Sequence, residues 1–157
     1  MRPPGLVETL EQIADDLHAL TEDWWLIGSA AMVLMGVDLA AIDDVDILTT
    51  PAGARALAAQ WGIVPTTPRP SDRFASDVFF QRTDTPLAVE VMAGFRVRAA
   101  DGWTPVLPRS RAPLAGPGGP WFAPSRDELL AMLALFGRTQ DAERAVLLRA
   151  VSQVAGG

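Results

Sequence analysis

Three acidic residues interrupt two apolar segments of the sequence. Asp44 and Asp46 alternate with Val45 and Ile47, and Glu90 lies in the middle of the segment LAVEVM. In a β-strand, residues two positions apart point to the same face of the sheet. The carboxylates of Asp44 and Asp46 therefore share one face, while Val45 and Ile47 point into a core. If the two strands are neighbours, Glu90 joins Asp44 and Asp46 on that face.

This arrangement has a chemical use and a simpler alternative. Like charges this close raise the pKa of one of the carboxyls and destabilise the fold. Hard divalent cations such as Mg²⁺ relieve the repulsion because they prefer carboxylate oxygen, and three carboxylates suit a site for one or two such ions. The alternative is that the three acids lie at exposed strand positions and contact only water.

Gly28 and Ser29 form a second candidate site. They follow the apolar segment 24–27 and precede the segment AAMVLMG, which is typical of a short buried helix. Backbone N–H groups at the start of a helix favour phosphate. Gly28 permits close approach of the backbone, and the Ser29 hydroxyl can donate to a phosphate oxygen. The alternative is an ordinary turn, and the spacing matches neither a P-loop nor a dinucleotide fingerprint.

Other segments must position these residues. Apolar spacing, caps and turn residues predict helices at 6–20, 30–36, 52–62, 126–137 and 139–154, and strands at 24–27, 44–50, 74–82, 86–97 and 103–107. Residues 108–125 are rich in proline and glycine and predict a mobile loop or a connection. The order of elements indicates an α+β fold, a mixed sheet flanked by helices with a small helical tail at the C-terminal end.

Composition narrows the class of protein. The chain has 157 residues, 49% of them hydrophobic, which predicts one domain over 1–157, with a core at about 20–110 and a helical tail at about 125–155. There is no cysteine and hence no disulfide, and all 13 basic residues are arginine. The net charge of −6 argues against bulk nucleic-acid binding. No membrane span or secretory signal is visible, so we expect a cytoplasmic protein.

The order of three segments resembles the signature of the nucleotidyltransferase superfamily with the DNA polymerase beta-like fold. These segments are LIGSAAMVLMG, DVDIL and VEV. Fourteen residues separate Ser29 from Asp44, and this spacing looks closer to the AbiEii-like and related uncharacterised branches. In the tail, Arg138 and Asp141 are similar to the Arg-x-x-Asp element that such branches carry.

The resemblance implies a function and a role for each residue. It implies transfer of a nucleoside monophosphate from an NTP to an unidentified acceptor, which is a small molecule, a protein side chain or an RNA end. Asp44, Asp46 and Glu90 would be the catalytic residues and the ligands of Mg²⁺ or Mn²⁺, and Glu90 would also take the acceptor's proton. Gly28, Ser29 and Arg138 would bind the nucleotide.

Two sequence features favour a second hypothesis. Related chains often carry a basic residue shortly after the small helix, where this chain has Asp38, and their tail helix often carries a lysine, which this chain lacks. The alternative is therefore a catalytically degenerate domain of the same fold that binds a nucleotide or a protein partner, or one half of a toxin–antitoxin pair. A plain α+β domain with solvated acids is the remaining alternative.

Overall fold

A four-stranded sheet forms the centre of the protein, in a computed structural model that describes residues 2–151. Its order is β1 (Trp24–Ile27), β2 (Asp44–Thr49), β5 (Ala88–Ala93) and β4 (Val78–Arg82). The central strands β2 and β5 are parallel, whereas β1 and β4 pair antiparallel with their neighbours. The predicted mixed sheet is confirmed.

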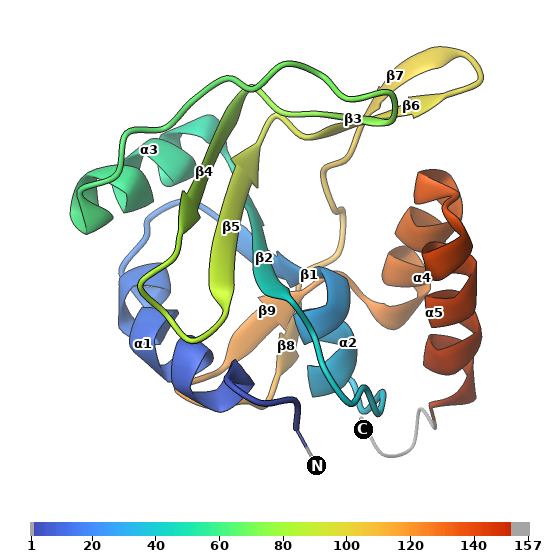
Figure 1. Ribbon diagram of the computed structural model, residues 1–157, viewed down its shortest axis with the longest axis horizontal. Helices are drawn as coiled ribbons and strands as arrows, with labels where there is room; N and C mark the ends of the chain where they lie inside the picture. The colour runs from blue at the N-terminus through green and yellow to red at the C-terminus, as the bar shows by residue number, and fades with distance from the viewer. Residues whose placement is uncertain (1, 152–157) are drawn as a thin grey trace.

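Helices lie on both sides of this sheet (Figure 1). On one side are α1 (Leu6–His18) and α3 (Pro51–Trp61). A hydrogen bond connects these two helices: Trp61 Nε1–H of α3 donates to Asp16 Oδ2 of α1 at 2.7 Å. On the other are α2 (Gly28–Leu34), α4 (Arg126–Phe136) and α5 (Thr139–Ala150). The helical tail is thus confirmed as α4 and α5, and the end of the last predicted helix, residues 152–154, lies outside the described residues.

The apolar alternation of the two central strands explains which side of the sheet is fully buried. Val45 and Ile47 of β2 and Val89 and Val91 of β5 have no exposed surface. They belong to the main hydrophobic core together with the buried residues of α1 and α3. Burial of this face, at roughly 25 cal/mol for each Å² of apolar surface, is what holds β2 and β5 in place.

Two helix starts follow the predicted capping chemistry. The Thr50 hydroxyl accepts a hydrogen bond from the backbone N–H of Gly53 at 3.1 Å, with Pro51 in the first turn of α3. The Ser125 hydroxyl accepts from the backbone N–H of Glu128 at 3.2 Å at the start of α4. Each cap satisfies a backbone donor that the helix itself leaves free.

Two predicted strands are each divided in the structure. The segment 74–82 contains β3 (Phe74–Ala75) and β4, and the segment 86–97 covers β5 and the first two residues of β6 (Arg96–Ala99). β3, β6 and β7 (Gly102–Pro105) form a separate three-stranded sheet. The division coincides with an ion pair in which Arg96 Nη1 donates to Asp77 Oδ1 at 2.7 Å and also to the Gly94 carbonyl, fixing the bend after β5.

The segment 108–125, for which a mobile loop or a connection was predicted without strands, contains a hairpin. This segment forms the hairpin of β8 (Ala112–Leu114) and β9 (Trp121–Ala123), which lies beside β1. Trp121 is fully buried, donates through Nε1 to the Pro117 carbonyl at 2.8 Å, and meets Trp24 edge-on with ring centroids 5.6 Å apart. Packing of Trp121 against the core orders a segment whose composition alone predicts turns.

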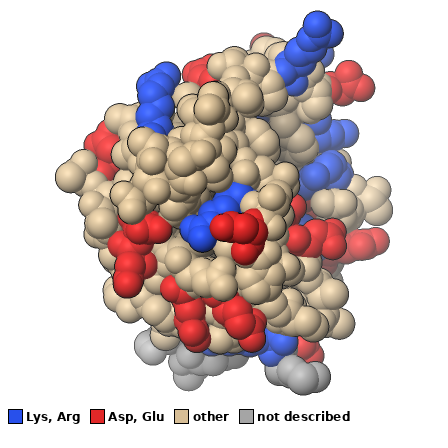
Figure 2. Space-filling model, turned by 60° about the vertical axis from the view of Figure 1, so that its left-hand side comes forward, with Lys and Arg blue, Asp and Glu red and all other residues tan. Residues whose placement is uncertain are grey.

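The outer surface carries charges of both signs. On the face in Figure 2, acidic side chains lie among single basic ones, in keeping with the net charge of −6. Among the described residues, no helix combines the length and the apolar character that crossing a bilayer requires.

The hairpin gives a test of the fold. Trp121→Ala removes a fully buried aromatic side chain, and we expect the free energy of unfolding to fall by about 3–5 kcal/mol. The matched control is Trp103→Ala, because the Trp103 residue is 37% exposed in β7. Chemical denaturation of both variants measures the difference, and equal losses would contradict the packing described here.

Candidate active site

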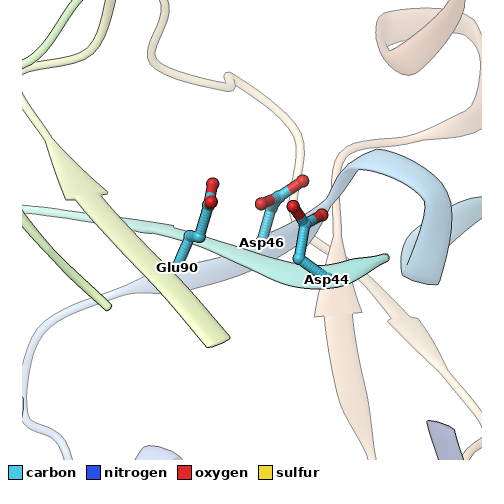
Figure 3. Close-up of side chains that lie close together, drawn as sticks. All are labelled: Asp44, Asp46 and Glu90. Atoms are coloured by element: carbon cyan, nitrogen blue, oxygen red, sulfur yellow. The ribbon is translucent and has the colours of Figure 1, made fainter. Parts of the chain in front are cut away.

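The register of β2 and β5 brings the three predicted acids together. Asp46 lies directly opposite Glu90 in this parallel pair, and Asp44 lies one pleat earlier on the same face. Figure 3 shows the three carboxylates pointing to the same side of the sheet. One carboxylate oxygen from each residue lies within 4.8 Å of those of the other two. This spacing allows all three to bind a common ion.

Burial and the negative charge of neighbouring acids raise the pKa of all three carboxyls. Burial is the largest cause for each residue. The pKa of Asp46 lies well above its ordinary value, and the charges of Asp44 and Glu90 raise it further. The charge of Asp43 adds to the rise at Asp44, and the charge of Asp44 adds to the rise at Glu90. The cluster therefore favours any ligand that brings positive charge.

One atom of the cluster lacks a partner within the described part of the chain. Asp46 Oδ1 is buried and accepts no hydrogen bond there. A buried carboxylate oxygen without a donor costs free energy that a ligand can recover. Oxygen atoms in a partly buried group of three carboxylates are the donor set that Mg²⁺ and Mn²⁺ prefer. The residues present therefore fit a divalent cation.

Gly28 closes one side of the cluster. It follows Ile27, which lies opposite Asp46 in the β1–β2 pair, and its φ of 68° is in the left-handed region that favours glycine. A Cβ atom at this position would lie 2.5 Å from Asp46 Oδ2. Glycine is thus required here both by the backbone and by the proximity of the carboxylate.

A cavity of about 340 Å³ separates the acidic face of the sheet from α4 and α5. One part of its wall is polar and includes Gly28, Asp46, Glu90, Arg138, Asp141 and Arg144. The other part is apolar and includes Phe74, Phe79, Met92, Phe95, Leu133 and Phe136. The cavity has the size of a small-molecule site, and its wall combines charged residues with apolar ones.

Other predicted residues lie at different distances from this cavity. Ser29 is only 7% exposed and is not on the cavity wall, although Gly28 beside it is. Asp44 is also absent from the wall, although its neighbour Asp46 lies on it. Asp38 is exposed in the segment between α2 and β2, and it too is absent from the wall.

Arg138 is held in place on the wall by Asp141. Its Nε and Nη2 atoms donate to the two carboxylate oxygens of Asp141, at 2.7 and 3.0 Å, and its backbone N–H donates to the same carboxylate. Asp141 is 1% exposed, so the pair anchors the start of α5 to the protein. The guanidinium also lies 4.9 Å from the centre of the Phe74 ring. Arg138 therefore faces the cavity in a fixed orientation.

Arg144 is a residue of the cavity wall that the sequence reasoning did not identify. It is half-buried, and its positive charge lowers the pKa of Asp44 and Asp46, against the larger effect of burial. Its position three residues after Asp141 places both side chains on one side of α5. That spacing was visible in the sequence, but the acids that Arg144 approaches are about a hundred residues away along the chain.

Known structures share this architecture. A protein of Thermotoga maritima, provisionally named a nucleotidyltransferase, matches with 24% identity and a TM-score of 0.74 over 91% of each chain. The lincosamide antibiotic adenylyltransferase LnuA, solved with lincomycin bound, matches with 12% identity and a TM-score of 0.61 over 92% of this chain and 96% of that one. No protein-family model matches the sequence, and no curated protein is significantly similar to it. The chain thus has the predicted nucleotidyltransferase-like fold.

The contact between Gly28 and Asp46 can be separated from the backbone requirement at Gly28. Gly62 has nearly the same φ, 67°, but an added Cβ there meets no atom within 4 Å. Gly62→Ala should cost only the left-handed backbone penalty, about 1–2 kcal/mol. We expect Gly28→Ala to cost at least about 1 kcal/mol more, because its methyl group displaces Asp46. The free energies of unfolding of both variants measure this, and equal losses would contradict the close approach.

The raised pKa of Asp46 predicts how stability depends on pH. The folded protein holds protons on this carboxyl at pH values where the unfolded chain, with an ordinary Asp pKa of 3.8, has lost them. Stability attributable to Asp46 therefore falls as the pH rises above about 4. In metal-free buffer, Asp46→Asn should raise Tm at pH 7 by about 2 °C or more, and less at pH 4.

Asp84→Asn provides the control for this pH series. The hydrogen bond from Arg82 lowers the pKa of the Asp84 carboxyl, so its contribution has the opposite sign. The control variant should not gain stability at pH 7. A gain for Asp46→Asn that is as large at pH 4 as at pH 7 would contradict the repulsion within the cluster.

Proposed function

We propose that this protein is a metal-dependent nucleotidyltransferase that moves a nucleoside monophosphate from an NTP to an acceptor. The observation that carries the proposal is the acidic cluster: three carboxylates within 4.8 Å, with the buried Asp46 Oδ1 unpartnered in the described chain, beside a cavity of ligand size. The nucleotidyltransferase-like fold supports the same conclusion independently of these distances.

Asp44, Asp46 and Glu90 would hold Mg²⁺ or Mn²⁺. A metal held there would supply positive charge that offsets the negative charge of the phosphates during transfer. The same three residues are the ones we propose as catalytic, since their carboxylates lie within 4.8 Å of one another beside the cavity.

In the proposed step, an oxygen of the acceptor attacks the α-phosphorus of the NTP. A bond forms between that oxygen and phosphorus, and the bond from phosphorus to the bridging oxygen breaks. Pyrophosphate leaves with the electron pair, and the acceptor's proton passes to the Glu90 carboxylate. Burial raises the pKa of Glu90, which makes its ionised carboxylate a stronger proton acceptor.

Gly28, Ser29 and Arg138 complete the proposed nucleotide site. The backbone at Gly28, next to Asp46, would contact the phosphates, and the Ser29 hydroxyl would support the same turn. Arg138 would contact the nucleotide from the opposite wall, with its guanidinium orientation set by Asp141.

The acceptor belongs to one of three classes: a small molecule, a protein side chain or an RNA end. The size of the cavity favours a small molecule, and LnuA, which shares the fold, is an adenylyltransferase of lincosamide antibiotics. The predicted AbiEii-like branch rests on the fourteen residues between Ser29 and Asp44. We also propose a cytoplasmic location, where NTPs are available, and a toxin–antitoxin context goes with the non-catalytic alternative.

Asp46→Ala is the direct test of this function. We expect the variant to fold, because it loses a carboxylate that its neighbours repel. Transfer of label from α-³²P-labelled NTPs should fall by more than about 100-fold, since loss of a residue that only supports a metal ligand already costs about 10- to 100-fold. The loss should be the same with Mg²⁺ and with Mn²⁺. Full activity of Asp46→Ala would refute the mechanism.

Thermal-shift measurements combined with the transfer assay separate the proposed enzyme from a catalytically degenerate domain of the same fold. Asp38 and the absence of lysine are the sequence features that favour the degenerate domain. Each NTP is added with and without Mg²⁺ or Mn²⁺, to the native chain and to Asp44→Ala. A metal-dependent shift that Asp44→Ala abolishes, together with transfer of label, supports the enzyme. The same shift without transfer to any acceptor class supports a nucleotide-binding protein, and no shift at all contradicts both.

A further inference from the structure

The apolar part of the cavity begins one pleat away from Glu90. Met92 lies two residues after Glu90 in β5 and therefore on the same face of the sheet, and Phe79 of β4 lies directly opposite Met92. Both side chains line the cavity. Residues two apart in a strand are separated by about 7 Å. A small molecule whose reacting oxygen lies at Glu90 therefore places its remaining atoms over Met92 and Phe79.

The strand order separates this apolar part from the proposed phosphate site. The order is β1, β2, β5 and β4, with Gly28 directly after β1 and beside Asp46 of β2. Glu90 lies opposite Asp46 on the next strand, and Phe79 lies on the strand beyond. An acceptor attacks in line, from the side opposite to the leaving pyrophosphate. The apolar part thus lies where the acceptor, and not the phosphates, would bind.

The aromatic rings on this wall are already ordered. Phe74 and Phe95 stack with their centroids 5.7 Å apart, and Phe136 meets the two rings edge-on at 5.5 and 5.9 Å. Phe79 is half-buried and takes part in none of the aromatic pairs of residues 2–151, so the part of its ring on the wall is available to a ligand. A preformed aromatic wall favours a flat apolar ligand, because little side-chain entropy is lost on binding.

The charges on the wall disfavour a cationic ligand. Among its described residues the acids are Asp46 and Glu90, which are proposed metal ligands, and Asp141, which is paired with Arg138. The exposed Arg69 adds a positive charge at the edge of the cavity. Once a metal offsets the first two acids, a cationic acceptor would find no free carboxylate among these residues and would be repelled by the arginine.

We propose that the acceptor is an uncharged small molecule that combines a flat aromatic body with a hydroxyl group. Phe79 and Met92 bind the aromatic body, and the hydroxyl lies at Glu90, where its oxygen attacks the α-phosphorus. This inference rests on the proposed function and adds to it the chemical class of the acceptor. Burial of the aromatic body supplies the affinity, and the charges of the wall supply the discrimination against cations.

Two matched probes test the preference for an uncharged ligand without relying on turnover. Hydroxytryptophol and serotonin share a hydroxylated indole ring, and their side chains end in a hydroxyl group and an ammonium group, respectively. In isothermal titration calorimetry with Mg²⁺, we expect hydroxytryptophol to bind at least about tenfold more tightly than serotonin. Equal or tighter binding of serotonin would overturn the inference. So would a dissociation constant of hydroxytryptophol weaker than about 1 mM.

Substitution of Phe79 tests where the ring of the probe lies. Phe79→Ala should lower the affinity for hydroxytryptophol about tenfold, and Phe79→Leu should lower it less, because leucine keeps apolar surface but loses the aromatic ring. The matched control is Phe122→Ala, since Phe122 is a half-buried phenylalanine of β9 outside the cavity wall. It should leave the affinity unchanged. Tm values above the assay temperature show that each variant is folded, and native affinity in a folded Phe79→Ala or Phe79→Leu variant overturns the inference.

A nucleotide titration distinguishes failure of this inference from failure of the proposed function. The ligand is a non-hydrolysable ATP analogue with a methylene group between the α- and β-phosphates, added with Mg²⁺ before hydroxytryptophol. We expect the affinity for hydroxytryptophol to change by less than about twofold, since the two ligands would occupy adjoining parts of the cavity. Displacement of hydroxytryptophol would assign the apolar part to the base of the nucleotide, which overturns the inference and leaves the proposed function intact. If the native chain does not bind the analogue, the proposed function itself fails.

Discussion

Mutual repulsion of three half-buried carboxylates is the constraint on which the site depends. Asp44, Asp46 and Glu90 occupy one face of two adjacent parallel strands, and no rotation of a side chain in a pleated strand moves it to the other face. Their separation is therefore set by the sheet register. Gly28 adds to the constraint, because its lack of a Cβ allows the backbone to pass Asp46. The repulsion is built into the fold, and a bound cation relieves it.

The opposite face of the same strands supplies the stability that this arrangement needs. Val45, Ile47, Val89 and Val91 are fully buried against the side of the sheet that carries α1 and α3. Each acid thus alternates with a residue that anchors its strand. A strand that slipped by one position would bury the acids in the core and expose the valines, so one register satisfies both faces. The same alternation that stabilises the sheet also positions the carboxylates.

The sequence predicted those features that depend on local periodicity and failed at those that depend on distant contacts. Alternation of polar and apolar residues identified the acidic faces, and the caps at Thr50 and Ser125 marked two helix starts correctly. The β8–β9 hairpin was missed because the burial of Trp121 against Trp24 orders it, and its own residues are typical of turns. Arg144 was missed for a similar reason, since only the packing of α5 over the sheet brings it near Asp44 and Asp46.

The charges around the cavity explain why the donor would arrive as a metal complex. When ionised, the three acids carry three negative charges, and Arg69 and Arg144 on the cavity wall carry two positive charges, while Arg138 and Asp141 neutralise each other. One negative charge remains, and a triphosphate would add further negative charge. A divalent cation that accompanied the nucleotide would offset both, which is why the proposed reaction calls for a metal-bound donor.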